Sequence, residues 1–138
     1  MTNFSIIKKI ELKFAVVSLC KDETVRILVK SGSEITTNNL DELFSVYNEL
    51  VQGKRHPFIY ILEDDSIVIT KEVRTYFRAS EKAFPKTCIA IIAASLPIKL
   101  MANFYLKFHK PTTNIKIFNN ELDATKWCYQ EQSKLLKN

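Results

Sequence analysis

The sequence FIYIL at residues 58–62 decides the fold class, because five consecutive apolar residues suit a strand that is buried on both faces of a sheet. A second apolar run, CIAIIA, follows at residues 88–93. Between the two runs lies an amphipathic segment with helical spacing that begins at Thr70 and ends before Pro85. A strand, a helix and a strand in this order predict a right-handed crossover. We therefore expect the two strands to lie side by side and to point the same way.

The remaining elements alternate in a similar manner on both sides of this unit. Two runs rich in Val, Ile and Leu, at residues 12–20 and 24–29, are separated by polar residues and predict a hairpin. The other expected elements are a helix at residues 40–51 that ends at Gly53, a helix from Pro97 to about His109, a strand at residues 115–118 and a last helix after Asn120. The order ββαβαβαβα predicts an α/β fold with a mostly parallel five-stranded sheet, an opening hairpin and four helices.

Length and composition limit the organisation of the chain and its possible functions. Its 138 residues suit one domain, which we expect to span residues 1–138. Hydrophobic residues make up 46% and charged residues 25%, which is typical of a globular protein and not of a disordered one. The chain has two glycines, Gly32 and Gly53, which lie far apart. A GxGxxG dinucleotide turn and a glycine-rich phosphate loop are therefore both excluded.

The cysteines and the apolar runs indicate the compartment. Cys20, Cys88 and Cys128 are odd in number and lie in apolar surroundings, which is poor material for a disulfide framework. We expect all three to be reduced and buried. We also expect no export signal at the N-terminus and no membrane span, since no run reaches about 18 apolar residues. The expected location is the cytoplasm.

The net charge of +5 has an uneven distribution. Residues 96–138 carry most of the positive excess, and their basic residues are all lysines. Arginine is the side chain that makes two-pronged contacts to phosphate or guanine. We therefore interpret this charge as a solvated face and expect no nucleic-acid partner.

Three stretches of the chain resemble a known group of proteins. They are ITKEVR at residues 69–74, NFYLK at residues 103–107 with Lys110-Pro111 following, and the tail with IF at residues 117–118 and ATKW at residues 124–127. Together with the order of elements, they resemble uncharacterised bacterial SpoIIAA-like domains of the STAS/SEC14 type. The resemblance covers about residues 12–127 and implies the SpoIIAA-like fold.

The resemblance also implies a function through binding, because the better-understood STAS proteins are regulatory modules without chemistry of their own. It places partner contacts at the start of the second helix and in the loop before it. The partner-binding candidates are Asp64, Asp65, Thr70, Lys71 and Arg74. Where the family pattern has an Asp-Ser pair followed by a glycine, this sequence has Thr70-Lys71 and no glycine. We interpret Thr70 first as a helix cap, with phosphorylation as the alternative.

The sequence gives little evidence for a metal site or a catalytic site. The three cysteines, His56 and His109 show no spacing that suits a zinc site, and Cys88 in its apolar strand is interpreted as a core residue. The acidic residues 63–65 follow a strand, which suggests either a solvated loop or a weak Mg²⁺ site. We expect no catalytic residue, no cofactor and no enzymatic activity.

The third predicted helix has an unusually wide apolar surface. A polar ridge is formed by Lys99, Asn103, Lys107 and Lys110. Apolar residues fill the remaining circumference, which exceeds the stripe of about 100° that covers a sheet. Either neighbouring helices bury the surplus, or an edge of the helix binds something else. The candidates for self-association or ligand contact are Ala102, Phe104, Tyr105 and Leu106.

The sequence therefore predicts a non-catalytic regulatory module of the STAS-like type that binds another protein, with a homodimer as a further option. The alternative is a carrier or sensor of a small apolar ligand, which the SEC14-type relatives and the aromatic third helix suggest.

Overall fold

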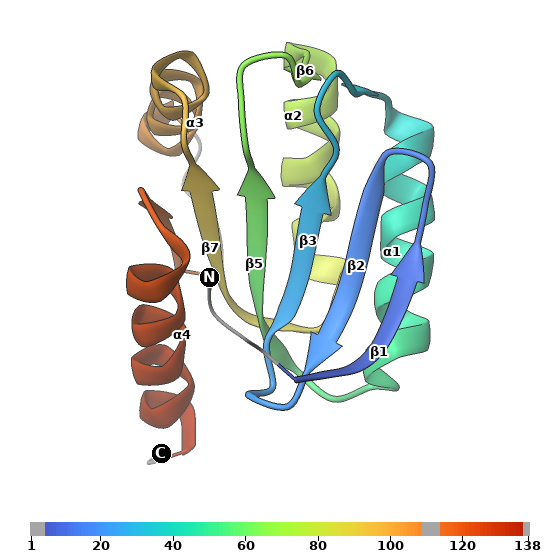
Figure 1. Cartoon of the computed structure of the whole chain (residues 1–138), viewed down its shortest axis with the longest axis vertical. Helices are drawn as coiled ribbons and strands as arrows, with labels where there is room; N and C mark the ends of the chain where they lie inside the picture. Colours follow the sequence, from blue (N-terminus) through green and yellow to red (C-terminus); the bar gives the residue numbers. More distant parts are fainter. Residues whose placement is uncertain (1–4, 109–113, 137–138) are drawn as a thin grey trace.

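A computed structural model describes residues 5–108 and 114–136 of the chain (Figure 1). The central sheet has the strand order β1-β2-β3-β5-β7-β8. Its strands are β1 (Ile6–Glu11), β2 (Ala15–Cys20), β3 (Val25–Val29), β5 (His56–Leu62), β7 (Lys86–Ala93) and β8 (Ile115–Phe118). Strand β2 runs antiparallel to β1 and β3, whereas β3, β5, β7 and β8 pair in parallel. The mostly parallel sheet predicted from the sequence is confirmed, and Tyr60 on β5 lies beside Ile91 on β7.

In the described part of the chain, four helices surround the sheet, as the sequence predicts. They are α1 (Thr37–Val51), α2 (Lys71–Ser80), α3 (Leu96–Phe108) and α4 (Glu121–Leu136). Helix α2 ends earlier than expected, and a short 3-10 turn, η1 (Glu81–Ala83), leads to Phe84. Helix α1 begins with a capping box in which Thr36 and Asn39 exchange hydrogen bonds.

The expected five-stranded sheet requires a correction, because the described residues form six strands in it and a separate two-stranded sheet. The sixth strand, β1, lies at the edge, and its residues Ile6 and Ile7 are half-exposed or more. An edge strand needs no continuous apolar run, so its sequence IIKKIE lacked the signal that revealed the inner strands. The small sheet pairs β4 (Glu34–Ile35) with β6 (Val68–Ile69), each too short for a pattern.

The helices are divided between the two faces of the sheet. Strand alternation turns Phe58 toward the core that includes residues of α1, α2 and α3, and turns Ile59 toward α4. Figure 1 shows α1 and α2 behind the sheet and α3 at the carboxyl end of β7. The larger core contains a group of contacting rings, and the T-shaped pair of Tyr47 and Phe58 has its ring centroids 4.8 Å apart.

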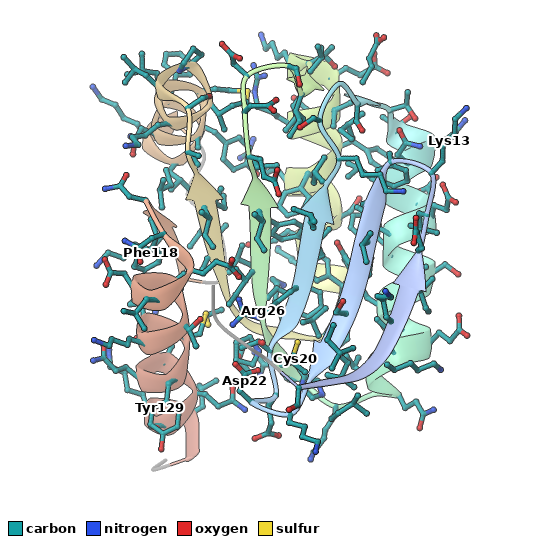
Figure 2. The ribbon with its side chains drawn as sticks, in the orientation of Figure 1. Lys13, Cys20, Asp22, Arg26, Phe118 and Tyr129 are labelled. Carbon is teal, nitrogen blue, oxygen red and sulfur yellow. The ribbon has the colours of Figure 1, made fainter. Side chains whose placement is uncertain are left out.

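Helix α4 is fixed to the opposite face by apolar and charged contacts. Ala124 and Cys128 pack on strands β5 and β7 in a second, smaller core. Arg26 on β3 is buried, and its guanidinium donates to Glu121 and to Thr125, each at 2.9 Å, in the first turn and a half of α4. Asp22 also pairs with Arg26, and Figure 2 shows the two residues close together at this end of the sheet.

Candidate functional site

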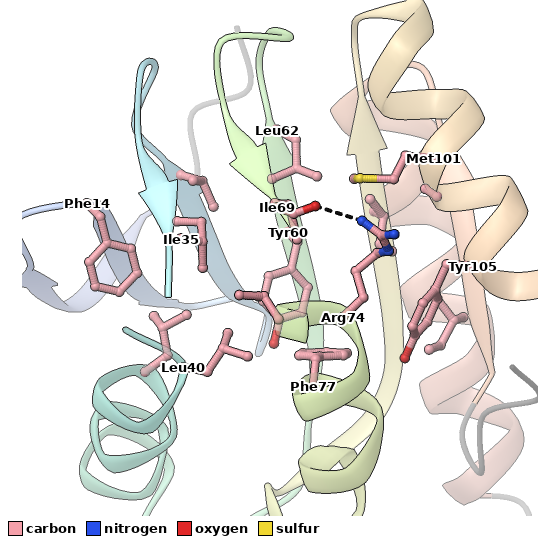
Figure 3. A pocket seen from close by; sticks show the side chains of 16 residues that line it. Phe14, Ile35, Leu40, Tyr60, Leu62, Ile69, Arg74, Phe77, Met101 and Tyr105 are labelled. Carbon is pink, nitrogen blue, oxygen red and sulfur yellow. Dashed lines mark hydrogen bonds between the residues drawn. The ribbon is translucent and has the colours of Figure 1, made fainter. Parts of the chain in front are cut away.

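An apolar pocket of about 130 Å³ lies at the carboxyl end of the parallel strands, between the sheet, α2 and α3 (Figure 3). Its floor comes from Tyr60 and Leu62 on β5 and from Ile91 on β7. The carboxyl end of the strands is where open α/β sheets commonly bind ligands. The remaining walls come from the following residues: Phe14, Val29, Ile35, Leu40, Leu43, Ile69, Val73, Arg74, Phe77, Met101, Ala102, Tyr105 and Ile115.

Local periodicity brings these side chains to the pocket. Tyr60 and Leu62 are two residues apart on a strand and therefore share a face. Val73 and Phe77 are four residues apart on α2, as are Met101 and Tyr105 on α3, so each pair lies along one side of its helix. Ala102 also faces the pocket.

The tyrosine hydroxyl groups in the pocket wall are held in a neutral state. The phenol oxygen of Tyr60 lies 3.0 Å from that of Tyr47, which is fully buried. Burial raises the pKa of Tyr60 well above its ordinary value, and burial also raises the pKa of Tyr105 to about 12. Both phenols therefore stay uncharged at physiological pH.

Arg74 is the one charged residue among the described residues that line the pocket. Its Nη1 donates to the backbone carbonyl of Ile69 at 2.7 Å, which fixes the guanidinium beside the end of β6. Figure 3 shows Arg74 on the α2 wall, opposite Met101 and Tyr105. The surface of the pocket itself is entirely apolar, so Arg74 contributes the apolar stem of its side chain to the wall.

The five predicted partner-binding residues have different surroundings in the structure. Thr70 caps α2 by accepting from the backbone N–H of Val73 at 3.3 Å, so its predicted capping role is confirmed. Asp65 and Lys71 are exposed at the same edge, whereas Arg74 turns into the pocket wall. Asp64 accepts from the hydroxyl of Ser31 at 2.7 Å and from Ser66. Its hydrogen bonds from Ser66 and Ser31 lower the pKa of Asp64, and they give it a role in closing the loop.

Metal binding at residues 63–65 receives no support. Within the described part of the chain, no three His, Cys, Asp or Glu side chains gather closely enough to hold a metal ion. Asp64 is engaged with serine hydroxyl groups, as described above.

The cysteines lie in the core, as predicted. Cys20, Cys88 and Cys128 are buried and unpaired as disulfides. Cys88 and Cys128 face each other across the β7–α4 packing, and their hydrogen bond raises the pKa of Cys128 and lowers the pKa of Cys88. Burial raises the pKa of Cys20. All three thiols are closed off from solvent by the core around them.

Helix α3 separates its predicted candidates into two groups. Ala102 and Tyr105 are buried and line the pocket, whereas Phe104 is 64% exposed and Leu106 is partly buried. In the predicted polar ridge, Asn103 and Lys107 are exposed and Lys99 is partly buried. Lys110 lies outside the described residues, as do His109 and Pro111.

A second apolar feature of α3 joins the predicted candidate Phe104 to Leu96 and Leu100, which were not among the candidates. Leu96, Leu100 and Phe104 are spaced four residues apart and are 65%, 60% and 64% exposed, respectively. We call these three residues the α3 stripe. Their spacing was visible in the sequence, but the stripe could not be separated from the buried apolar residues of the same helix.

The fold is an α/β fold of the SpoIIAA-like kind, as comparison with one solved structure shows. The chain is similar to an uncharacterised protein of the DUF3478 family from Shewanella loihica PV-4, which has a SpoIIAA-like fold. The TM-score is 0.53 at 9% identity, over 93% of this chain and 97% of that one. A protein of unknown function from Arthrobacter sp. FB24 is 25% identical over 86% of this chain and 95% of its own, with a TM-score of 0.30.

The particular family is shown by a match to residues 18–132. The chain belongs to the family described as "Domain of unknown function (DUF7793)". No curated protein matches the chain. Among the described residues, no helix has the length and apolar character that crossing a membrane requires.

Proposed function

We propose that this chain is a non-catalytic binding module of the SpoIIAA-like type that carries or senses a small apolar molecule in the pocket between α2 and α3. The observation that supports this function most directly is the apolar cavity itself, with its volume of about 130 Å³. Protein interiors are normally packed with few voids larger than a water molecule. Apolar cavities of about 150 Å³ stay dry and bind molecules such as benzene.

The position of the pocket suits a sensor. Its walls come from α2, α3 and the sheet, so a ligand that fills it contacts all three at once. A ligand that binds only the folded state stabilises that state in proportion to the logarithm of its concentration. Filling the pocket would therefore hold α2 and α3 more firmly against the sheet.

Benzene is a suitable first probe of this function. At about ten times its dissociation constant, benzene is expected to raise the melting temperature by about 5 °C. The variant Ala102→Leu adds a larger side chain to the pocket wall and is expected to abolish this shift. Ala79→Leu makes the same change on the exposed surface of α2 and serves as the matched control.

Two results would count against ligand binding. If benzene and xenon leave the chemical shifts of Met101 and Ala102 unchanged, the cavity holds no apolar guest. If Ala102→Leu and Ala79→Leu respond equally to benzene, the guest lies elsewhere.

The second candidate function is the regulatory interaction with another protein, including self-association as a homodimer. The α3 stripe favours it, because large exposed apolar patches commonly mark interaction surfaces. Asp65 and Lys71 are exposed at the start of α2 and would supply polar contacts. Sedimentation of the full chain with and without Leu100→Glu tests the homodimer, and a monomer at high micromolar concentration in both cases would reject it.

The proposal includes no catalytic role, and the state of the thiols agrees with this choice. All three cysteines are buried, and the pKa values of Cys20 and Cys128 are raised. The pocket offers a ligand an apolar surface, which suits binding and supplies no reactive group. Turnover in a broad substrate screen, lost on Ala102→Leu, would overturn this part of the proposal.

A further inference from the structure

We propose that Cys88 and Cys128 form a reversible disulfide when the chain meets a peroxide, and that this bond joins helix α4 covalently to strand β7. The inference is independent of the pocket, because both residues lie in the smaller core on the opposite face of the sheet. Two observations support it: the contact between the two thiols, and the hydrogen bonding that prepares one of them to react.

The fold brings the two thiols together from distant parts of the sequence. Strand alternation turns Cys88 and Ala90 of β7 toward α4. On α4, Ala124 and Cys128 are four residues apart and therefore face the sheet together. Both thiols are fully buried between these elements, and a hydrogen bond joins their side chains. A disulfide requires two side chains that point at each other in this way, and its sulfur atoms then approach to about 2.05 Å.

The hydrogen bonds give the two thiols different roles. The thiol of Cys128 donates to the sulfur of Cys88, and the hydroxyl of Thr87 also donates to that sulfur, over 4.0 Å. Donation by Cys128 is the largest cause that lowers the pKa of Cys88, whereas the same hydrogen bond, together with burial, raises the pKa of Cys128. The thiolate is the reactive form of a cysteine. We therefore expect Cys88 to react first with the oxidant and Cys128 to complete the disulfide.

A peroxide is the oxidant in both steps of this reaction. The Cys88 thiolate attacks one oxygen of hydrogen peroxide, the O–O bond breaks, and hydroxide leaves and takes up the Cys88 proton as water, which leaves a sulfenic acid on Cys88. The Cys128 sulfur then attacks the Cys88 sulfur, the S–O bond breaks, and hydroxide leaves with the Cys128 proton as a second water. Two thiols and one peroxide thus give one disulfide and two waters. Both sulfur atoms are oxidised, and both peroxide oxygens are reduced.

Burial makes this reaction depend on the opening of α4. Both thiols are 0% exposed, so a peroxide reaches them when α4 moves away from the sheet. The guanidinium of Arg26 holds α4 in place through its hydrogen bonds to Glu121 and Thr125. Once formed, the disulfide closes the segment 88–128, which contains α3 and β8, and it stabilises the fold by restricting the unfolded chain. Oxidation would thus fix α4 in its closed position.

The experiment treats the reduced full chain with hydrogen peroxide, alkylates the remaining thiols in urea and measures the intact mass. The expected product has lost about 2 Da before alkylation, and dithiothreitol restores the original mass. Only Cys20 should be alkylated, and peptide mapping should find Cys88 and Cys128 linked within one chain. The linked protein is expected to melt about 5–10 °C higher than the reduced protein.

Cys20 supplies a matched control within the same chain. It is also buried, but its side chain forms hydrogen bonds with Thr24 and Arg26. Cys20→Ala is expected to keep the disulfide, whereas Cys88→Ala and Cys128→Ala should each remove it. Arg26→Met should form the disulfide at least about threefold faster, because α4 opens more often. Peptide mapping of the unsubstituted protein keeps the test decisive if a core variant does not fold.

Three results would overturn the inference. A disulfide that contains Cys20, or one that joins two chains, places the reactive contact elsewhere. A gain of about 16 or 32 Da without a disulfide means that the thiols are oxidised separately. An unchanged mass in both the unsubstituted protein and Arg26→Met means that the two sulfur atoms do not form a bond. Each of these results leaves ligand binding in the pocket unaffected, because the pocket lies on the other face of the sheet.

Discussion

The phenol oxygens of Tyr47 and Tyr60 lie 3.0 Å apart, and this contact connects the fully buried side of α1 to the floor of the pocket. Burial is the main cause that raises the pKa of both phenols. The pair therefore supplies a polar contact inside an otherwise apolar core, and each hydroxyl satisfies the other.

Replacement of both members of this pair should cost less than the sum of the two single replacements. Tyr60→Phe leaves the Tyr47 hydroxyl buried without its partner, which is expected to lower the free energy of unfolding by about 1–2 kcal/mol. In the double variant with Tyr47→Phe, no orphaned hydroxyl remains, so we expect a smaller loss than the sum of the single losses. Urea denaturation measures all four proteins, and strict additivity would contradict the coupling.

Removal of the Arg26 guanidinium should loosen α4 before the rest of the fold. Arg26→Met leaves Glu121 and Thr125 without their donor, and we expect a loss of about 2 kcal/mol because Arg26 is buried while its partners are partly exposed. Native-state hydrogen exchange should show faster exchange in α4 than in α1. Lys126→Met, at an exposed position of α4, is the control and should leave exchange nearly unchanged. Equal acceleration throughout the protein would contradict a local anchor.

Glu131 should contribute to stability in a way that disappears in acid. Its carboxylate accepts from Lys134 at 2.8 Å and from Asn114 at 2.6 Å, and these hydrogen bonds, with Lys134 first, lower the pKa of Glu131 below 4.5. A lowered pKa in the folded state means that the contribution is complete above the unfolded pKa and is lost as the pH falls through the folded value. Denaturation at pH 7 and at successively lower pH should show this loss in the parent protein. The Glu131→Gln variant should lack this acid-induced loss of stability. If stability falls with pH in parallel for the two proteins, Glu131 makes no such contribution.

The three thiols should report on opening of the core. Cys20, Cys88 and Cys128 are each 1% exposed or less, so an aromatic disulfide reagent cannot reach them in the folded chain. We expect slow modification in buffer and rapid modification of all three in urea. The rate in buffer should rise with destabilisation by Arg26→Met, because modification requires opening. Fast reaction of Cys88 or Cys128 in the folded protein would contradict the close packing of α4 on the sheet.

The central crossover could be predicted from the sequence, because continuous apolar runs have few alternatives. The runs at residues 58–62 and 88–93 became β5 and β7, paired in parallel with Tyr60 beside Ile91. Strand β1 escaped prediction since an edge position tolerates the two lysines in its middle. Element boundaries also shifted where two kinds of helical turn meet, as at Ser80 and η1.

The candidate site was less accessible from the sequence, because its residues come from distant segments. The surplus of apolar residues in α3 drew attention to Ala102 and Tyr105, which line the pocket, although it did not indicate which residues of the helix face inward. Arg74, selected as a partner-binding candidate, also lines the pocket, which its position in the sequence did not indicate. No sequence pattern around Phe14 or Ile35 indicates a binding site. These residues reach the pocket wall only because β4 and the hairpin pack against the sheet.

The edges of the sheet restrict how copies of this chain can meet. Strand β1 ends the sheet on one side with an irregular register between Ile6 and Lys8, and it carries Lys8 and Lys9 along its length. Strand β8 ends the other side after four residues, one of which is the exposed Lys116. Edge strands that are short, charged or irregular disfavour edge-to-edge pairing into a continuous intermolecular sheet. At high concentration this chain should therefore resist fibre growth, and any assembly it forms should join through helices.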